Sequence, residues 1–583
     1  MIPYLNNIPQ YLSHWARSTP DAEALFVVGT HSRSFTYNRL ADLVANQAFQ
    51  LSTLGVGKGD RVAVLVNLDE RLVINLLATA SIGAVALPIS VDSLPCRDVL
   101  RHYAQIKPLR AVARSGRFRR LLCEALADQP PLPALDLDAS LSAADAARRS
   151  EWEELVGRRT GNEPFYVNHT SGSTSTPKLI EPTDAQLLAN AHACLKAFGS
   201  GSDLRLLCTF VYHQHEHFLR PLVAGGCAVL LPYHQGESEL TAECTAGRIT
   251  HLMTNPPKAE AFAAEPGLEK LRGQLRVVEV GGGLLRDGLA RCIAAATGAA
   301  VISAYGSTET AGVALASTPA PFTEENGLSP LPGYEAMVVD DNGKPVPSGS
   351  SGELVLKGPA VASSYLTTPP GDVRLEGGQF LTRDLAMRNS NGRIKILGRM
   401  DSAIKLLGSR QPLEPIEQAL AEGFGLHARV VQCLDVEPND YLGRRLGTAL
   451  IALVLLQDGA AGHDTDWQRR LAHCALRHAR LAAYLTSPRH FLFVGPDEVR
   501  LEGGKLQRKH ARERFPLVLA DWRPEDRARL LPAPIFWSDR WRALRRLQVE
   551  SRALRHPIRV VWRELIRVVW QFFRGKELRD GHG

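Results

Sequence analysis

A run of hydroxyl side chains that ends in a lysine is the first stretch of this sequence that suggests chemistry. It consists of Thr170, Ser171, Gly172, Ser173, Thr174, Ser175, Thr176, Pro177 and Lys178. Glycine lets backbone N–H groups turn inward, hydroxyls add hydrogen-bond donors and lysine adds a positive charge, so the loop suits a polyphosphate. On these residues alone, a solvated Ser/Thr turn is the alternative interpretation.

Two later segments end in residues that could hold other parts of a nucleotide. Gly281, Gly282 and Gly283 follow an expected strand at 277–280, and a planar ligand could lie against their bare backbone. A second strand, from Val301, leads into Tyr305, Gly306, Ser307, Thr308 and Glu309. Tyrosine can stack on a base, threonine can bond a phosphate oxygen, and a carboxylate can hold Mg²⁺. A capped helix start would explain Ser307 and Thr308 but not the whole set.

Three histidines form a further cluster after an expected strand at 204–211. His213, His215 and His217 alternate with Gln214 and Glu216. On a strand these histidines would share one face, which is a spacing that metal ligands use. Because no Cys/His partner cluster accompanies them, a ligand pocket or a buried polar cluster is the favoured interpretation.

The surrounding patterns predict an α/β fold. An expected strand at 61–66, a helix at about 70–80 and a strand at 83–88 form a β-α-β unit with a parallel sheet, and a helix at about 184–198 follows the hydroxyl-rich loop. From about residue 331, short strands between Gly/Pro turns predict a β-rich subdomain. We expect a large domain of parallel and mixed sheets with this β-subdomain over residues 1–400, a small mobile α+β domain over 401–515, and a basic helical extension over 516–583.

Taken together and in this order, the motifs resemble those of the adenylate-forming superfamily, which comprises acyl- and aryl-CoA synthetases, nonribosomal adenylation domains and luciferases. The resemblance covers roughly residues 10–515. It implies that Thr170–Lys178 handles the β- and γ-phosphates, that Gly281–Gly283 forms the wall beside adenine, and that Tyr305 stacks on adenine. It also implies that Thr308 contacts the α-phosphate and that Glu309 binds Mg²⁺.

Further positions follow from the same resemblance. Asp384, in Thr382-Arg383-Asp384, would bond the ribose hydroxyls with help from Arg399. Asp401 falls at the hinge of the small domain, and Lys505 at the lysine that stabilises charge during adenylation. Lys505, Thr308, Glu309 and Lys178 are therefore the expected catalytic residues. Three residues depart from the family pattern: Ser175 and Arg383 replace glycines, and Gln411 replaces an apolar residue.

The resemblance implies an AMP-forming acid–thiol ligase that uses ATP and Mg²⁺. His213, Gln214 and His215 occupy the family's acyl-pocket motif and are most like those of stand-alone ligases in aryl-polyene and xanthomonadin-type pigment pathways. A hydroxylated aromatic acid passed to the phosphopantetheinyl group of an acyl carrier protein is therefore expected. The alternatives are a fatty acyl- or aryl-CoA synthetase that uses CoA, and a catalytically degenerate nucleotide-binding scaffold.

The cysteine pattern and the N-terminus predict a cytoplasmic protein. The nine cysteines are scattered without a C-x-x-C pair, and the N-terminus lacks the pattern of a signal peptide. The formal charge of +7 equals the excess of basic over acidic residues after residue 515. Arginines at 555, 559, 563 and 567 oppose an apolar side, which predicts a basic amphipathic helix. Contact with the inner face of a membrane, an acidic carrier protein and docking onto the enzyme itself all fit this helix, whereas no nucleic acid is expected.

Overall fold

A computed structural model of the chain contains two compact units, Met1–Ile396 and Leu397–Gly583, and each is described by itself. The structure describes residues 2–29, 31–65, 68–89, 100, 103–114, 133–136, 146–169, 178–210, 214–232, 240–317, 322–323, 325–366, 374–400, 404–406, 409–411, 417, 428–436, 449–456, 491–494, 501–502 and 505–506. The predictions made for Thr170–Thr174, His213, Asp401 and the extension over 516–583 therefore lie outside the described residues.

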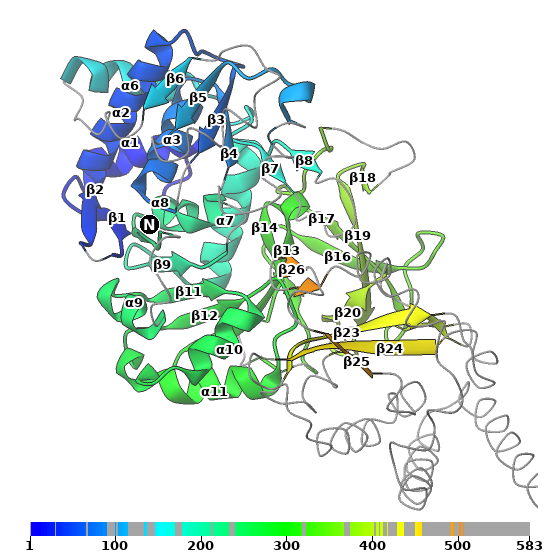
Figure 1. The fold of residues 1–583 in the computed structure, drawn as a ribbon. Helices are drawn as coiled ribbons and strands as arrows, with labels where there is room; N and C mark the ends of the chain where they lie inside the picture. The colour runs from blue at the N-terminus through cyan, green and yellow to red at the C-terminus, as the bar shows by residue number, and fades with distance from the viewer. Residues whose placement is uncertain are drawn as a thin grey trace, which may run out of the picture. The chain divides into compact units, whose positions relative to one another are not determined.

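A nine-stranded sheet forms the centre of the first unit (Figure 1). Six adjacent strands run parallel, and antiparallel strands complete both edges, so the predicted α/β class is confirmed with a mixed sheet. The order is β15 (Ser329–Pro330), β14 (Gly312–Ala316), β13 (Ala300–Ser307), β12 (Val277–Val280), β11 (His251–Thr254), β9 (Arg205–Cys208), β10 (Cys227–Leu230), β1 (Glu23–Val27) and β2 (Arg33–Thr36).

Helices cover both faces of this sheet because its central strands are apolar on both sides. In β9, Leu206 and Cys208 belong to one hydrophobic core, while Leu207 between them belongs to another. The first core includes residues of α1 (Ile8–Ser18), α7 (Asp184–Phe198) and α8 (Leu219–Ala224), and the second includes residues of α9 (Leu240–Ala246), α10 (Pro256–Ala264) and α11 (Asp287–Thr297). This alternation is typical of buried parallel strands.

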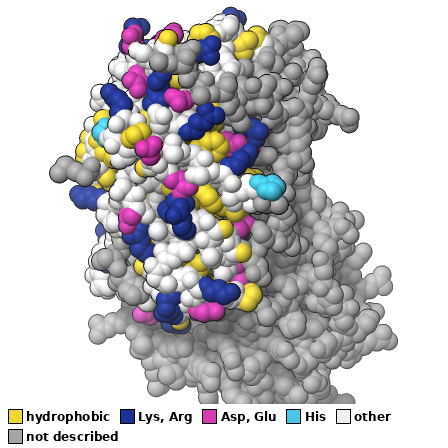
Figure 2. Space-filling model, turned by 90° about the vertical axis from the view of Figure 1, so that its left-hand side faces the viewer, with side chains coloured by type: hydrophobic (Ala, Val, Ile, Leu, Met, Phe, Trp, Pro, Cys, Tyr) yellow, Lys and Arg dark blue, Asp and Glu magenta, His cyan; other side chains and the backbone are white. Residues whose placement is uncertain are grey.

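A four-stranded parallel sheet, formed by residues that precede the hydroxyl-rich loop in the sequence, confirms the predicted β-α-β unit. Its strands are β4 (Val85–Ile89), β3 (Arg61–Leu65), β5 (Ala111–Arg114) and β6 (Ala134–Asp136), and the associated helices are α2 (Tyr37–Thr53), α3 (Glu70–Ser81) and α6 (Ala146–Arg158). On the face of the molecule shown in Figure 2, the described basic and acidic side chains intermingle.

The predicted β-rich subdomain is a five-stranded antiparallel sheet. It consists of β16 (Glu335–Val339), β17 (Ser351–Lys357), β19 (Gln379–Arg388) and β18 (Leu375–Glu376), with β20 (Ile394–Arg399) paired to β19. The described strands of the second unit are β21 (Ile404–Leu406), β22 (Ser409–Gln411), β23 (Ala428–Val436), β24 (Ala449–Leu456), β25 (Phe491–Val494), β26 (Leu501–Glu502) and β27 (Lys505–Leu506). Among the described residues, no helix is both long and apolar enough to span a membrane.

Candidate active site

The carboxyl ends of the central parallel strands bring several predicted residues to one edge of the sheet, where ligands bind in open α/β folds. Gly281 and Gly282 follow β12 there, and Gly282 has a left-handed backbone with φ of 74°. A Cβ added at Gly281 would lie 3.2 Å from the carbonyl oxygen of Ala304 and 3.6 Å from Cζ of Phe210. Gly281 thus passes closest to the backbone of β13, and the ring of Phe210, a residue that the sequence motifs did not single out, lies beside both glycines.

Tyr305 and Asp384, which are far apart in the sequence, meet directly. The Tyr305 hydroxyl donates a hydrogen bond to Oδ2 of Asp384. Thr382 fixes the backbone before this carboxylate, because its Oγ1 accepts from the Asp384 N–H at 3.0 Å and donates to the Leu354 carbonyl at 2.9 Å. Two side chains expected to bind adenosine are therefore held together by β13 and β19.

Thr308 and Glu309 lie on a short, buried 3-10 helix, η4 (Thr308–Thr310). Ser307 caps this turn together with Thr310, as the capped-helix interpretation expected. Glu309 is 6% exposed, and its Oε1 accepts a 2.6 Å hydrogen bond from the Tyr365 hydroxyl. Thr308 Oγ1 lies 3.4 Å from the His169 carbonyl. The turn is thus tied to the residue that immediately precedes the hydroxyl-rich loop.

The two ends of that loop are held by antiparallel strands. In β7 (Asn168–His169) and β8 (Leu179–Ile180), His169 pairs with Leu179 and Asn168 pairs with Ile180. Lys178 directly precedes β8, and its Nζ lies 4.7 Å from the centre of the Tyr365 ring. Lys178, Tyr365 and Glu309 therefore form one cluster at the end of the loop, although the loop itself lies outside the described part of the chain.

The described part of the histidine cluster is helical and buried. Gln214–His217 is a 3-10 helix, η2, so His215 and His217 do not lie on one face of a strand, and their burial fits the favoured interpretation of a buried polar cluster. His215 is 2% exposed, with Nδ1 2.6 Å from the Tyr166 hydroxyl and Nε2 3.1 Å from the Ala311 carbonyl oxygen. Because a carbonyl can only accept, the neutral ring carries its proton on Nε2 and Nδ1 accepts from Tyr166.

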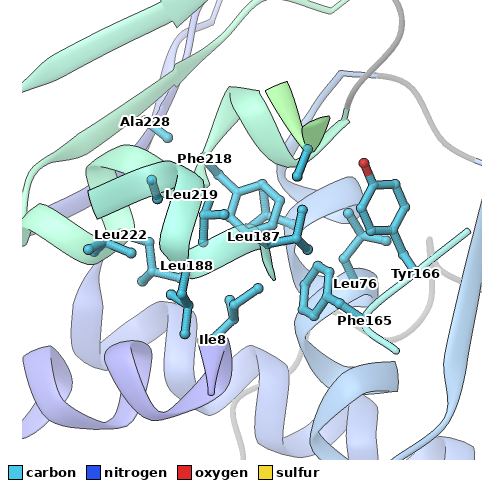
Figure 3. Close-up of a cluster of buried hydrophobic side chains, with 14 of the residues drawn as sticks. Ile8, Leu76, Phe165, Tyr166, Leu187, Leu188, Phe218, Leu219, Leu222 and Ala228 are labelled. Atoms are coloured by element: carbon cyan, nitrogen blue, oxygen red, sulfur yellow. The ribbon is translucent and has the colours of Figure 1, made fainter. Parts of the chain in front are cut away.

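His215 thereby connects two parts of the candidate site. Figure 3 shows Phe165 packed among aliphatic side chains, with the Tyr166 hydroxyl directed away from them. Tyr166 leads toward the hydroxyl-rich loop, and Ala311, with φ of 54°, directly follows η4. Both ring nitrogens of His215 have partners within the protein, which favours a structural role for this side chain; its assignment to the acid pocket remains a prediction.

Buried charges lie beside this histidine. Burial raises the pKa of Glu216 to about 8, with Arg220 opposing and Glu279 reinforcing the shift. Arg220 is committed to Glu279 through two hydrogen bonds, of 2.6 and 3.2 Å. Glu216 is therefore predominantly protonated at neutral pH, whereas Arg220 and Glu279 form a buried ion pair.

The remaining predicted residues belong to the β-subdomain and to the second unit. Arg383, which replaces a family glycine, has φ of 62°, and its backbone N–H donates to Oε1 of Glu353 at 2.9 Å. Arg399 is exposed at the end of β20. Lys505 begins β27 and pairs with Glu502 of β26, and the structure describes the backbone there but not the side chain.

The donor set around Glu309 fits Mg²⁺ bound together with a nucleotide. Within the described part of the chain, no group of three or more His, Cys, Asp or Glu side chains could form a protein-only metal cage. Mg²⁺ is commonly held by one or two carboxylates plus substrate phosphates, and one buried carboxylate beside a lysine-ended loop meets that requirement. The same finding for the described residues agrees with the favoured interpretation of the histidine cluster as a ligand pocket or buried polar cluster.

Comparison with known proteins agrees with this geometry. The model of a family described as AMP-binding enzyme matches residues 12–366. The chain belongs to this AMP-binding enzyme family. One curated relative of this AMP-binding enzyme is novobiocin biosynthesis protein H of Streptomyces niveus, 29% identical over 73% of this chain and 72% of the relative. Sulfoacetate–CoA ligase of Cupriavidus necator is 28% identical over 82% of this chain and 91% of the relative.

Other matches show how widely the fold is used. The chain spans only 5% of the length of a probable non-canonical nonribosomal peptide synthetase, CymA of Salinispora arenicola, with 31% identity over 72% of the chain. Among solved structures, the anthranilate CoA ligase AuaEII in complex with anthranoyl-AMP matches 89% of this chain and 99% of its own, with a TM-score of 0.74 and 20% identity. This structural match supports the fold.

Proposed function

We propose that this AMP-binding enzyme is an acid–thiol ligase that converts a carboxylic acid into an acyl-AMP and then into a thioester. The observation that carries the proposal is the cluster of Glu309, Tyr365 and Lys178 at the end of the hydroxyl-rich loop. It places a buried carboxylate and an ammonium group beside a loop suited to phosphates. The Tyr305–Asp384 pair supplies an aromatic ring and a carboxylate for the adenosine part of the same nucleotide.

In the first half-reaction, a carboxylate oxygen of the acid bonds to the α-phosphorus of ATP as the bond to the bridging oxygen of pyrophosphate breaks. Lys178 and the loop would stabilise the charge that grows on the departing pyrophosphate, and Thr308 would donate to an α-phosphate oxygen. Glu309 would hold Mg²⁺, which supplies positive charge to the phosphate oxygens when bound. Lys505 would stabilise the same transition state from the second unit.

In the second half-reaction, the sulfur of a thiol bonds to the carbonyl carbon of the acyl-AMP, the thiol proton is lost, and AMP leaves with the bonding electron pair. We propose that the second unit reorients about Asp401 between the two steps, so that Lys505 is needed for the first step only. The acceptor that we favour is the phosphopantetheinyl thiol of an acyl carrier protein, and CoA is the alternative.

For the acid, we propose a hydroxylated aromatic acid, as activated in bacterial pigment pathways. The pocket motif His213-Gln214-His215 supports this choice. The names of relatives are compatible with several acids, because they include an indoleacetate–CoA ligase of Aromatoleum aromaticum, 27% identical over 82% of this chain, as well as the sulfoacetate–CoA ligase. A fatty acid remains the second candidate substrate.

Acid-dependent ATP–pyrophosphate exchange tests the activity directly. We would supply a panel of hydroxybenzoic, hydroxycinnamic, indoleacetic, medium-chain fatty and sulfonated acids, each with and without Mg²⁺. Exchange that is strongest with hydroxylated aromatic acids is the expected result. Exchange with fatty acids alone would transfer the proposal to the second substrate class. ATP binding without exchange for any acid would contradict the ligase and favour the non-catalytic scaffold.

A separate experiment distinguishes the acceptors and the proposed membrane contact. The best acid would be incubated with ATP and either CoA or a phosphopantetheinylated carrier protein, and thioester formation measured by mass spectrometry; preference for the carrier protein is expected. Flotation with anionic vesicles would compare the full chain with one lacking residues 530–583. Equal vesicle binding by both proteins would eliminate membrane contact through the extension.

A further inference from the structure

Tyr365 is the residue on which three charged groups of the candidate ATP site converge. Its hydroxyl donates to Oε1 of Glu309 at 2.6 Å, while Lys178 Nζ and Arg374 Cζ lie 4.7 and 5.6 Å from the centre of its ring. Tyr365 is 5% exposed and packs with Ile180 and Ala362, and Leu375 lies against them. The ring is therefore held in place by side chains of β8, of the segment just before Tyr365, and of β18.

The hydroxyl and the ring of Tyr365 favour opposite charges: the hydroxyl favours a carboxylate, and the ring favours cations. A phenol that donates to a carboxylate forms a charge-assisted hydrogen bond, which fixes the orientation of the carboxylate. The face of the aromatic ring attracts an ammonium or guanidinium group at these distances. The ring thus holds two cations, Lys178 and Arg374, and a polyphosphate bound at the loop that Lys178 ends would be attracted by their charge.

The main chain adds a second connection between the same segments. The Ala362 N–H donates to the Glu309 carbonyl at 2.8 Å, and the Leu366 N–H donates to the Leu179 carbonyl at 2.8 Å. The segment 362–366 thus connects η4, which carries the expected metal carboxylate, with β8, which follows the phosphate-loop lysine. Tyr365 lies between these two connections.

We propose that Tyr365 is a positioning residue that sets the metal-binding carboxylate Glu309 and the phosphate-binding lysine Lys178 relative to each other. The proposal rests on the proposed ATP-dependent activity. In it, the hydroxyl orients Glu309 toward Mg²⁺, and the ring independently holds Lys178 for the nucleotide phosphates. Two substitutions separate these tasks: Tyr365→Phe removes the hydroxyl and keeps the ring, whereas Tyr365→Leu removes both.

The test measures equilibrium binding of a fluorescent ATP analogue, first in EDTA and then during titration with MgCl₂, without acid or turnover. For Tyr365→Phe we expect affinity in EDTA to stay within about two-fold of wild type, since the cation–ring contact is kept. The Mg²⁺ concentration for half-maximal enhancement of binding should rise about ten-fold, because loss of a hydrogen bond that orients a metal ligand commonly weakens the site by that factor or more. Tyr365→Leu should show the same Mg²⁺ defect and, in addition, an approximately three-fold loss of affinity in EDTA.

Tyr37→Phe is the matched control. Its hydroxyl donates to the Gly226 carbonyl at 2.7 Å in the buried core, away from η4 and β8, so the control loses a buried tyrosine hydrogen bond without altering nucleotide or Mg²⁺ binding. Thermal melting of each variant establishes that it is folded, and Tyr365→Phe carries the test if the leucine variant fails to fold.

The outcomes separate the two proposals. Wild type that binds the analogue, combined with an unchanged or lowered Mg²⁺ midpoint in Tyr365→Phe, would overturn the positioning role and leave the ligase proposal standing. If Tyr365→Phe lost affinity for the ATP analogue equally in EDTA and in Mg²⁺, the positioning role would also be overturned, because the hydroxyl would then act on the whole site and not on Mg²⁺ binding. Wild type that neither binds ATP nor exchanges pyrophosphate would overturn the proposed function and this inference together.

Discussion

Glu216 is a carboxylic acid in a place where a carboxylate would be costly. It is 5% exposed, and a Cβ at Gly312 would lie 2.8 Å from its Oε1, so it packs closely against the strand that follows η4. The nearby Arg220 is committed to Glu279. The protein therefore pairs one buried carboxylate with Arg220 and raises the pKa of the other, which lowers the cost of burying both.

Replacing Glu216 with Gln tests this arrangement through the pH dependence of stability. Unfolded glutamate releases its proton near the ordinary value of 4.5, whereas the folded pKa of Glu216 is raised to about 8. Between these values the folded state binds more protons than the unfolded state. The contribution of Glu216 to the free energy of unfolding is therefore complete below pH 4.5 and is lost as pH rises, by at most about 1.4 kcal/mol per pH unit. Glu216→Gln should remove this slope and become more stable relative to wild type from pH 5 to 8.

Thermal unfolding midpoints at each pH unit in this range provide the measurement. His251, whose pKa burial lowers to about 4, contributes a slope of opposite sign, but it does so in both proteins and cancels in the difference. Glu335→Gln, which alters an exposed carboxylate on β16, is the matched control and should run parallel to wild type. Parallel curves for Glu216→Gln would show that Glu216 is ionised in the folded protein.

Arg383 shows the conformational cost of a departure from the family pattern. Its φ of 62° lies in the left-handed region, which costs a non-glycine residue roughly 1–2 kcal/mol. Arg383→Gly should therefore stabilise the protein by about 1 kcal/mol after the greater flexibility of the unfolded glycine is included. The backbone bond to Glu353 is kept in this variant.

Met387→Gly, in the same strand, is the comparison for Arg383→Gly in urea unfolding. It should lose more than about 1 kcal/mol, because glycine costs roughly 0.5–1 kcal/mol relative to alanine in a strand and the partly buried methionine side chain is lost as well. If both variants lose stability equally, interactions of the Arg383 side chain outweigh the backbone strain. The sequence identified this substitution but not its consequence, since whether the backbone stays left-handed depends on the β-subdomain around it.

At the scale of elements, the β13–η4–β14 segment positions the η4 turn because its strands approach unusually closely. A Cβ at Gly306 would lie 2.2 Å from the Gly312 carbonyl oxygen and 2.6 Å from its carbonyl carbon. The Tyr334 hydroxyl donates to the Thr310 carbonyl at 2.7 Å, and Asn190 Nδ2 donates to the Val313 carbonyl at 2.8 Å. Side chains from elsewhere in the unit thus hold two carbonyls of this hairpin.

Gly306→Ala should therefore disrupt both stability and the site. The added methyl group meets backbone that has no rotamer by which to move away, and we expect a loss of about 3 kcal/mol or more. Gly288→Ala in α11, where an added Cβ meets nothing within 4 Å, should be neutral or slightly stabilising. Differential scanning calorimetry compares them, and wild-type melting of Gly306→Ala would refute the close approach of β13 and β14.

The same elements show what sequence patterns could predict. The expected helix at 184–198 matches α7, whose capping box at Thr183 and Gln186 and left-handed Gly199 are local signals at both ends. The sequence did not predict the conformation of η2, because alternating histidines carry no apolar face that would distinguish a strand from a helix. In the structure, His215 of η2 contacts Tyr166 and Ala311, which lie far from it in the sequence.

At the scale of the whole molecule, the candidate site combines segments that are distant in the sequence. The order of the motifs identifies these segments but does not predict the contacts between them. Tyr305, Thr308, Glu309, Asp384 and Lys178 were identified by type and order. Tyr365 and Phe210 were missed, because neither belongs to a run of polar residues or to a periodic pattern. Their contribution arises from contacts with segments far along the chain, which no local spacing encodes.

The division of the chain into two units gives the last prediction. Glu309 and Lys178 belong to the first unit and Lys505 to the second, so we expect the proposed half-reactions to differ in their need for the second unit's lysine. Lys505→Ala should reduce ATP–pyrophosphate exchange by roughly 10²-fold or more, the size of effect seen when a group that stabilises transition-state charge is removed. Thioester formation from supplied acyl-AMP should stay within a few-fold of wild type.

Lys344→Ala, which removes an exposed ammonium from a turn of the first unit, is the matched control and should leave both rates unchanged. Single-turnover assays with the acid that gives the strongest exchange provide both measurements. Loss confined to the first half-reaction requires that Lys505 act only while ATP is being attacked, which in turn requires different arrangements of the second unit in the two steps. Equal loss of both half-reactions would mean that Lys505 supports a single arrangement throughout, and the proposed reorientation about Asp401 would have to be abandoned.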